Sequence, residues 1–328
     1  MLTSYLILAA GLILLVICGD LLVRGAIGIA QHLHIPPIII GLTVVAFGTS
    51  APELVISLNA ALSGSPDIAI GNVVGSNIAN ILIVMGLPAL FTATECNQPY
   101  IVRNSIYVLA ASLLFIVFCF WGPLHTVHGL ILLGLLAAFL FESGRRASQD
   151  RSAARAKLDG EILKGATSIP QRLWVLFAFV MLGLAGLPVA AHFTVESAKQ
   201  IAANWGVSEA AIGLTLVAFG TSLPELVTAL VAMVRRQGGI ALGNVLGSNL
   251  FNILGIVGVT ATVVPLPVPQ EFLRVDLWVM LAATIAVAPF ALFRARFGRA
   301  PGAFFVLAYL VYVAVVVMPK SLAVAHLM

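Results

Sequence analysis

Charged residues are scarce in this sequence. Only 17 lysines and arginines and 13 aspartates and glutamates occur among 328 residues, a charged fraction of 9%, whereas soluble domains carry about 25%. Hydrophobic residues make up 61% of the chain, and the mean hydropathy is +1.09. A water-exposed surface cannot be assembled from this composition, so soluble enzymes, nucleic-acid-binding proteins and intrinsically disordered proteins are excluded.

Cysteine is also scarce. The three cysteines, Cys18, Cys96 and Cys119, lie far apart in the sequence and form neither a disulfide framework nor a zinc-binding pattern. Long apolar runs are abundant, and each has about the length that crosses a hydrocarbon core of ~30 Å as a helix. The sequence therefore predicts an all-α, polytopic membrane protein whose surroundings are the lipid bilayer.

Ten apolar runs are predicted to be transmembrane helices. Five precede a hydrophilic stretch and five follow it. Their approximate boundaries are 3–23, 37–62, 68–91, 102–121, 124–142, 173–197, 210–234, 240–264, 273–293 and 302–319. We therefore expect a first five-helix repeat over residues 1–142, a basic loop over 143–172, and a second five-helix repeat over 173–328.

The basic residues predict the orientation of the chain. Seven of them lie within 143–172, and the positive-inside rule places such a loop in the cytoplasm. With the N-terminus then outside, only Lys199, Arg274 and Lys320 fall on the outer side. The net charge of +4 is thus a topology signal that needs no nucleic-acid partner, and no obligatory protein partner is indicated. Because the loop is too short for a regulatory domain, we expect a compact prokaryotic protein of the bacterial inner membrane.

Two segments of the chain are duplicated. Residues 40–54 (IGLTVVAFGTSAPEL) recur at 212–226 with 13 of 15 identical, and residues 71–82 (GNVVGSNIANIL) recur at 243–254 with 9 of 12 identical. Both matches have the same offset of 172 residues. Because each half holds an odd number of predicted spans, the second copy enters the membrane in the opposite direction. Such inverted repeats are typical of secondary transporters, with the binding site at the repeat interface near the bilayer midplane.

Two glutamates occupy equivalent positions in the repeats. Glu53 and Glu225 each lie within an otherwise apolar predicted span, where a carboxylate is unfavourable unless it faces a partner or a water-filled cavity. A buried ion pair would satisfy both groups, but no lysine or arginine lies in the middle of a predicted span. The pattern therefore favours a functional site built on the two carboxylates.

Further oxygen-bearing side chains follow a common spacing around these glutamates. Residues four apart lie on one face of a helix. Four polar pairs have this spacing, with two adjoining serines: Thr49–Glu53, Thr221–Glu225, Ser76–Asn80 and Ser248–Asn252, with Ser50 and Ser222. Carboxylate, hydroxyl and amide oxygens without thiolate or imidazole favour a hard cation such as Ca²⁺ or Na⁺. Hydrogen bonding between helices is the alternative role for any single one of them, but the symmetric duplication favours cation binding.

A proline precedes each glutamate. Pro52 and Pro224 have no N–H, so each removes one helical hydrogen bond and displaces the carbonyl four residues back. We therefore expect carbonyls near Ala46–Gly48 and Ala218–Gly220 to be released from the helix, where a cation would satisfy them. A simple kink is the alternative for either proline alone. Four glycines with small-xxx-small spacing predict close helix packing: Gly71, Gly75, Gly243 and Gly247.

The segments GTSAPE and GTSLPE, each followed by GNVxGSNxxN, resemble the two alpha-repeats of the cation/Ca²⁺ antiporter superfamily, on its sodium/calcium exchanger side. The resemblance covers alpha-repeat motifs at 40–86 and 212–258, and the five-plus-five layout covers the remainder. The GN-x-x-E pattern expected of proton-coupled members is absent. The resemblance implies secondary active antiport of Ca²⁺ against Na⁺ by alternating access, with no enzymatic reaction and no cofactor.

The resemblance also implies roles for individual residues. Glu53 and Glu225 are implied as shared ligands of Ca²⁺ and Na⁺, with further Ca²⁺ ligands from Thr49 and Thr221. The residues implied at two flanking Na⁺ sites are Ser50, Ser76, Ser222 and Ser248, with the carbonyls of Ala46 and Ala218. Asn80 and Asn252 are implied at the centre, where related proteins often carry an aspartate at one position. With asparagine at both, the central charge is −2 when both glutamates are ionised.

Three alternatives to sodium coupling are compatible with the residues alone. Protonation of one glutamate would relieve the repulsion between two buried carboxylates, so proton coupling in the same fold is the first, and potassium coupling is the second. The third is a cation channel, in which polar rings line a continuous pore. A membrane-embedded enzyme is disfavoured because the sequence contains neither HExxH nor GxSxG.

Overall fold

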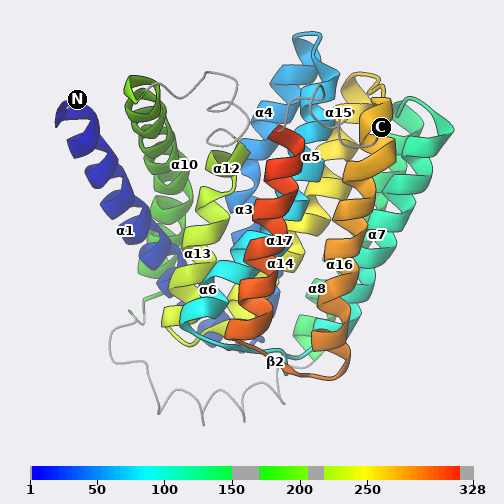
Figure 1. The fold of residues 1–328 in the computed structure, drawn as a ribbon. Helices are drawn as coiled ribbons and strands as arrows, with labels where there is room; N and C mark the ends of the chain where they lie inside the picture. Colours follow the sequence, from blue (N-terminus) through cyan, green and yellow to red (C-terminus); the bar gives the residue numbers. More distant parts are fainter. Residues whose placement is uncertain (1, 150–169, 171, 206–217, 318–328) are drawn as a thin grey trace.

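The computed structural model describes residues 2–149, 170, 172–205 and 218–317. These residues are largely helical (Figure 1). The helices are α1 (Leu2–Leu33), α2 (Pro37–Ile40), α3 (Ala46–Thr49), α4 (Ala51–Leu62), α5 (Pro66–Ala79), α6 (Gly86–Phe91), α7 (Ile101–Trp121), α8 (Thr126–Gln149), α10 (Leu173–Asn204), α12 (Ala218–Thr221), α13 (Leu223–Val234), α14 (Gly238–Phe251), α15 (Gly258–Val263), α16 (Leu277–Leu292) and α17 (Arg299–Val317). Segments of π-helix, η1 (Gly41–Val45), η2 (Asn80–Met85), η4 (Asn252–Val257) and η5 (Phe272–Asp276), adjoin them, and two short strands, β1 (Thr94–Glu95) and β2 (Arg296–Phe297), pair antiparallel.

The predicted membrane helices are confirmed in class and largely in position. Within the described ranges, eight helical segments are long and apolar enough to cross a membrane, and Pro37–Thr49 with Ala51–Leu62 forms a ninth if this bent pair is one span. The predicted span 210–234 lies partly outside the described residues, and its described part consists of α12 and α13. The all-α fold is therefore confirmed, while the ten-helix layout stays a prediction.

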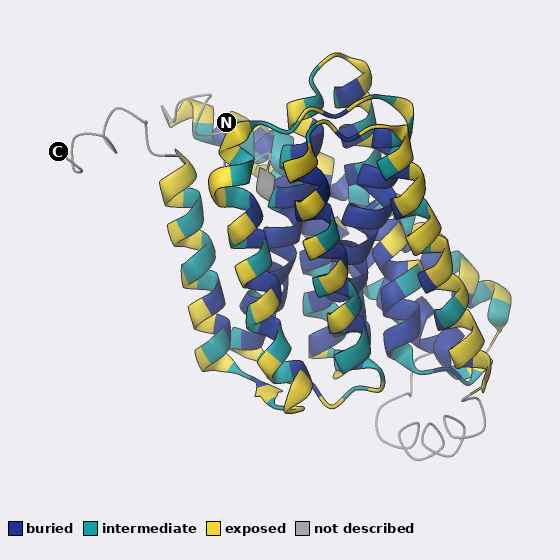
Figure 2. Ribbon diagram, turned by 90° about the vertical axis from the view of Figure 1, so that its right-hand side faces the viewer, coloured by how far each residue is buried: buried dark blue, intermediate teal, exposed yellow. Residues whose placement is uncertain are grey.

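The outer surface of the helix bundle is apolar. Figure 2 shows buried residues on the inner faces of the helices and exposed residues on the outer faces. Many exposed side chains are large and hydrophobic, and Ile13, Phe141, Trp174 and Phe304 are each more than 60% exposed. Soluble proteins rarely expose apolar surface on this scale, whereas lipid tails surround it readily. The protein is an integral membrane protein.

The helices α1 and α10 lie side by side at one edge of the bundle (Figure 1). A Cβ placed on Gly11 would contact Thr194, and one on Gly25 would lie 2.9 Å from the carbonyl oxygen of Leu176. Low residue numbers of α1 thus face high numbers of α10, so the two helices run antiparallel. Their glycines allow this close approach.

The helices of the GNVxGSN motifs lie inside the bundle. All residues in the most apolar part of Gly238–Val263 are buried, and 83% of those in the most apolar part of Pro66–Phe91 are buried. A Cβ on Gly243 would lie 2.4 Å from the carbonyl oxygen of Ile38, and one on Gly247 would lie 2.6 Å from that of Leu42. The predicted packing role is confirmed for these two glycines, which bring α14 against α2 and η1. It is wrong for Gly75, where an added Cβ would meet nothing within 4 Å.

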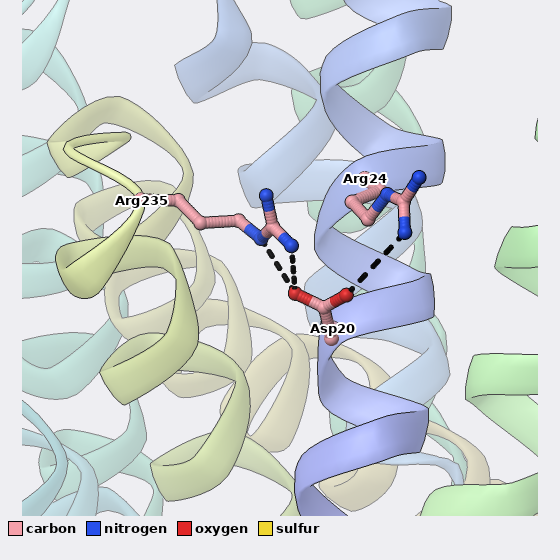
Figure 3. A network of polar contacts seen from close by, with 3 residues as sticks. All are labelled: Asp20, Arg24 and Arg235. Carbon is pink, nitrogen blue, oxygen red and sulfur yellow. Dashed lines mark hydrogen bonds and ion pairs between the residues drawn. The ribbon is translucent and has the colours of Figure 1, made fainter. Parts of the chain in front are cut away.

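An ion-pair network joins α1 to the end of α13 (Figure 3). Arg235 donates from Nε to Asp20 Oδ1 at 2.5 Å and also contacts it through Nη2, and Arg24 Nη1 lies 3.8 Å from Asp20 Oδ2. Helix α1 continues ten residues beyond the predicted apolar run, to Leu33, and contains both Asp20 and Arg24. The network ties α1 to the helix whose first turn holds Glu225.

Asp20→Asn is expected to lower the free energy of unfolding by about 1–2 kcal/mol, because two half-buried guanidinium groups lose their anionic partner. The measurement is thermal unfolding of the purified protein in detergent. The control is Glu196→Gln, which removes a pair with Lys199 inside one helix where the glutamate is 44% exposed. Equal melting temperatures for the two variants would show that the network does not stabilise the fold.

Gly243→Ala is expected to lower the free energy of unfolding by about 1–3 kcal/mol, because the added Cβ would overlap the backbone of Ile38 and force α14 away from α2. The same substitution at Gly134 in α8 meets open space, so we expect unchanged or slightly higher stability there. Thermal unfolding of both variants under one condition tests the difference. A Gly243→Ala protein as stable as the Gly134→Ala protein would contradict the close packing.

Candidate functional site

Each glutamate lies in the first turn of a helix, directly after an interruption between two consecutive helices. Ser50 separates α3 from α4 with φ −88° and ψ 5°, and Ser222 separates α12 from α13 with φ −87° and ψ 5°. The proline of each motif lies in that first turn, where its missing N–H costs no hydrogen bond. The prolines therefore start new helices at the break, and the axes on either side of Ser50 differ by 42°.

The expectation of a released carbonyl is wrong for Ala46. Its oxygen accepts the N–H of Ser50 at 3.0 Å, and the Thr49 hydroxyl lies within 3.4 Å of it. The last turn of α3 thus closes at Ala46, and the missing N–H of Pro52 affects the carbonyl four residues back, that of Gly48. The oxygen of Ala46 still has a second lone pair, so a ligand role for it stays a prediction. Ala218, the equivalent residue, begins α12.

Both carboxylates are buried. Glu53 is 1% exposed and Glu225 is 0% exposed. Ser50 donates a hydrogen bond from Oγ to Glu225 Oε1 at 3.0 Å. A side chain of the first motif therefore directly contacts the carboxylate of the second.

The remaining predicted residues lie on the next helix of each motif. Asn80 begins η2 and Asn252 begins η4, and Ser76 and Ser248 lie one turn earlier on α5 and α14. All four side chains are at most 4% exposed. Helix α4 packs against η4 and α13 packs against η2, so each glutamate-bearing helix meets the asparagine-bearing segment of the other repeat. Thr221 ends α12 and is half-buried.

Six buried oxygens of the predicted site have no hydrogen-bond partner within the described part of the chain. Such groups are rare in folded proteins, and each costs about 1–3 kcal/mol. They are Glu53 Oε2, Asn80 Oδ1, Ser222 Oγ, Glu225 Oε2, Ser248 Oγ and Asn252 Oδ1. Other buried side chains of the described residues, such as Ser143 and Thr260, also have an unpartnered oxygen, but these six all belong to the predicted ligand set.

Four asparagines around the site were missed by the sequence interpretation. Asn72 and Asn244 donate from Nδ2 to the backbone carbonyls of Glu53 at 3.2 Å and Glu225 at 3.3 Å, respectively. At the centre, Asn249 donates to the Asn77 carbonyl at 3.3 Å, and Asn252 donates to Asn77 Oδ1 at 3.4 Å. The available signal was their presence in both copies of GNVxGSN.

Among the described residues, no group of three histidine, cysteine, aspartate or glutamate side chains could hold a metal ion. The site instead combines two carboxylates with neutral hydroxyl and amide oxygens. Oxygen donors of this kind are chemically suited to a hard cation.

Comparison with known proteins identifies the family. The sodium/calcium exchanger protein family matches residues 3–143 and 175–318, which include both glutamate-bearing motifs. The chain belongs to the sodium/calcium exchanger family. The resemblance inferred from the GTSxPE and GNVxGSN segments is thereby confirmed.

Several members of the exchanger family are similar over nearly the whole chain. The putative antiporter CaxA of Alkalimonas amylolytica is 36% identical over 318 residues, covering 95% of this chain and 98% of the relative. The sodium/calcium exchanger MaX1 of Methanosarcina acetivorans is 34% identical over 317 residues, covering 88% of this chain and 91% of the relative. A solved structure of the sodium–calcium exchanger NCX_Mj, soaked with Na⁺ and Ca²⁺, matches with a TM-score of 0.81 at 32% identity, covering 96% of this chain and 98% of that one.

Ser50→Ala is expected to lower the free energy of unfolding by about 1–3 kcal/mol, because a second oxygen of the buried Glu225 carboxylate loses its hydrogen-bond donor. Ser112→Ala is the matched control, since Ser112 is equally buried but bonds the Val108 carbonyl within its own helix. Thermal unfolding in cation-free detergent compares the two. A loss no larger than that of Ser112→Ala would contradict a stabilising contact between the motifs.

Proposed function

We propose that this protein is a secondary active antiporter that exchanges Ca²⁺ for Na⁺ across the membrane by alternating access. The observation that carries the proposal is the pair of buried carboxylates, Glu53 and Glu225, surrounded by neutral oxygens without hydrogen-bond partners. An all-oxygen site of this kind suits hard cations. Relatives that are named antiporter and sodium/calcium exchanger support the same function.

Exchange follows from the electrostatics of this site. Two ionised glutamates neutralise one Ca²⁺, so the loaded site carries little net charge into the membrane interior. An empty site leaves two like charges buried near each other, which is costly in a low-dielectric environment. The empty protein therefore does not readily switch between its outward-open and inward-open states, whereas the cation-loaded protein does. Ca²⁺ is thus transported only in exchange for another cation.

The ligand assignment divides the oxygens between the two cations. The carboxylates of Glu53 and Glu225 bind both, and Thr49 and Thr221 add hydroxyl oxygens for Ca²⁺. The Na⁺ ligands are Ser50, Ser76, Ser222 and Ser248, with the carbonyls of Ala46 and Ala218. Asn80 and Asn252 lie at the centre and contribute no charge, so the two glutamates alone set the charge of the site.

The proposed architecture is two inverted five-helix repeats, residues 1–142 and 173–328, joined by the 143–172 segment. The offset of 172 residues places α1 within one residue of α10, and both helices contain 32 residues. Their antiparallel packing is what an inverted pair of first helices requires. The distribution of basic residues supports an outer N-terminus and a cytoplasmic 143–172 segment, and a relative of 36% identity is named inner membrane protein YrbG of Escherichia coli.

The test is radioactive Ca²⁺ uptake into proteoliposomes loaded with Na⁺, K⁺ or a pH gradient alone. Uptake is expected to require internal Na⁺. Glu53→Gln and Glu225→Gln are each expected to abolish it, because one carboxylate cannot neutralise Ca²⁺. Glu196→Gln, which removes a carboxylate at a half-exposed position, is expected to leave uptake intact.

Each other outcome contradicts part of the proposal. Uptake driven by the pH gradient alone would show that H⁺ is the coupling ion, and uptake driven by internal K⁺ alone would show that K⁺ is. Uptake that is independent of any internal cation would indicate a channel. Retained Ca²⁺ uptake in the folded Glu53→Gln protein would refute the glutamate site itself.

A further inference from the structure

Asn244 contacts both motifs of the site, although it is outside the proposed ligand set. It lies on α14 and is 0% exposed. Its Nδ2 donates to the backbone carbonyl of Glu225 at 3.3 Å, and its Oδ1 accepts a hydrogen bond from the Thr49 hydroxyl at 3.2 Å. One side chain thus holds the backbone of one glutamate and a hydroxyl from the other repeat.

The bond to Thr49 decides which side of that hydroxyl faces a cation. A hydroxyl has one proton and two lone pairs, and only the lone pairs can ligate a cation. The proton must therefore point to an acceptor away from the site. Thr49 lies within hydrogen-bond distance of two acceptors, Asn244 Oδ1 at 3.2 Å and the Ala46 carbonyl at 3.4 Å, and its hydroxyl also lies near the Glu225 carboxylate, which a bound cation would engage. The Ala46 carbonyl already accepts the Ser50 N–H, so Asn244 is the better one.

The equivalent residue of the first repeat, Asn72, supports a common positioning role. Its Nδ2 donates to the Glu53 carbonyl, as Asn244 does to that of Glu225, and also to Ser57 Oγ at 2.9 Å. The position equivalent to Ser57 is Ala229, which offers no hydroxyl. The Asn244 amide therefore lacks this contact within its own repeat, and its other end engages Thr49 across the interface.

We propose that Asn244 is a positioning residue of the cation site. It directs the Thr49 hydroxyl proton away from the site, so that the oxygen lone pairs face the cation, and it fixes the first turn of α13 against α14. The inference rests on the proposed function for the identity of the cation.

The test measures the Ca²⁺ concentration dependence of exchange in proteoliposomes for Asn244→Ala, Thr49→Val and the double variant. Asn244→Ala is expected to raise the KM for Ca²⁺ about tenfold with little change in the maximal rate, since it disorders a ligand. Thr49→Val is expected to raise the KM by a similar factor. The double variant is expected to raise the KM by clearly less than the product of the two single effects, because Asn244 acts on the cation mainly through Thr49. Thr49→Ser, which keeps the hydroxyl, is expected to retain the wild-type KM.

A purely structural role predicts a different pattern. Asn104→Ala removes an asparagine on α7 that is equally buried, and it is expected to lower the melting temperature without raising the KM. If Asn244→Ala does not fold, Asn244→Leu keeps the side-chain volume and takes its place. An unchanged KM in the folded variant, or effects that multiply in the double variant, would overturn the inference.

These outcomes are distinguishable from failure of the proposed function. Wild-type protein without cation-dependent Ca²⁺ uptake would refute the exchanger itself. If the wild-type protein exchanges Ca²⁺ and the Asn244→Ala protein has the same KM for Ca²⁺, only the positioning role is refuted.

Discussion

The burial of two like charges inside a membrane protein is the constraint on which the site depends. Glu53 and Glu225 are at most 1% exposed, and the ion pairs described in the structure involve other acidic residues, Asp20, Glu95, Glu142 and Glu196. A buried carboxylate without a cationic partner is stable only when hydrogen bonds or a bound cation compensate its charge. Ser50 supplies one such hydrogen bond to Glu225, and in the proposed function a bound cation supplies the remaining compensation.

The backbone around the glutamates is arranged to meet this constraint. In both motifs the helix is interrupted at a serine. The helix that follows therefore begins near the carboxylate, where the partial positive charge of a helix N-terminus favours an anion. The second motif of each repeat brings π-helical segments, η2 and η4, against the glutamate helices of the other repeat. Such segments are frequent at functional sites. Gly243 and Gly247 let the backbone of α14 approach closely enough for Asn244 to reach Thr49.

Much of this arrangement was predictable because it depends on patterns that repeat. Apolar runs predict helices in a bilayer, and the offset of 172 residues predicts equivalent places for Glu53 and Glu225. The extent of α1 was not predicted, because the apolar run ends near Asp20 and Arg24 whereas the helix continues through both, and the contact of Asp20 with the distant Arg235 has no signal in the sequence. The position of the break was missed for a similar reason. A proline indicates that a helix is interrupted nearby, but the Ser50 N–H to Ala46 bond that closes α3 depends on local geometry.

The hydrogen bond between Ser50 and Glu225 has a consequence for the origin of such a chain. Because a residue of one repeat completes the carboxylate of the other, half of the protein would possess only half of the site. On the proposed architecture and function, a single ancestral repeat would have bound a cation only as a pair of copies inserted in opposite directions. Duplication and fusion would have fixed the two copies in that arrangement, after which each could diverge, as Ser57 and Ala229 have done.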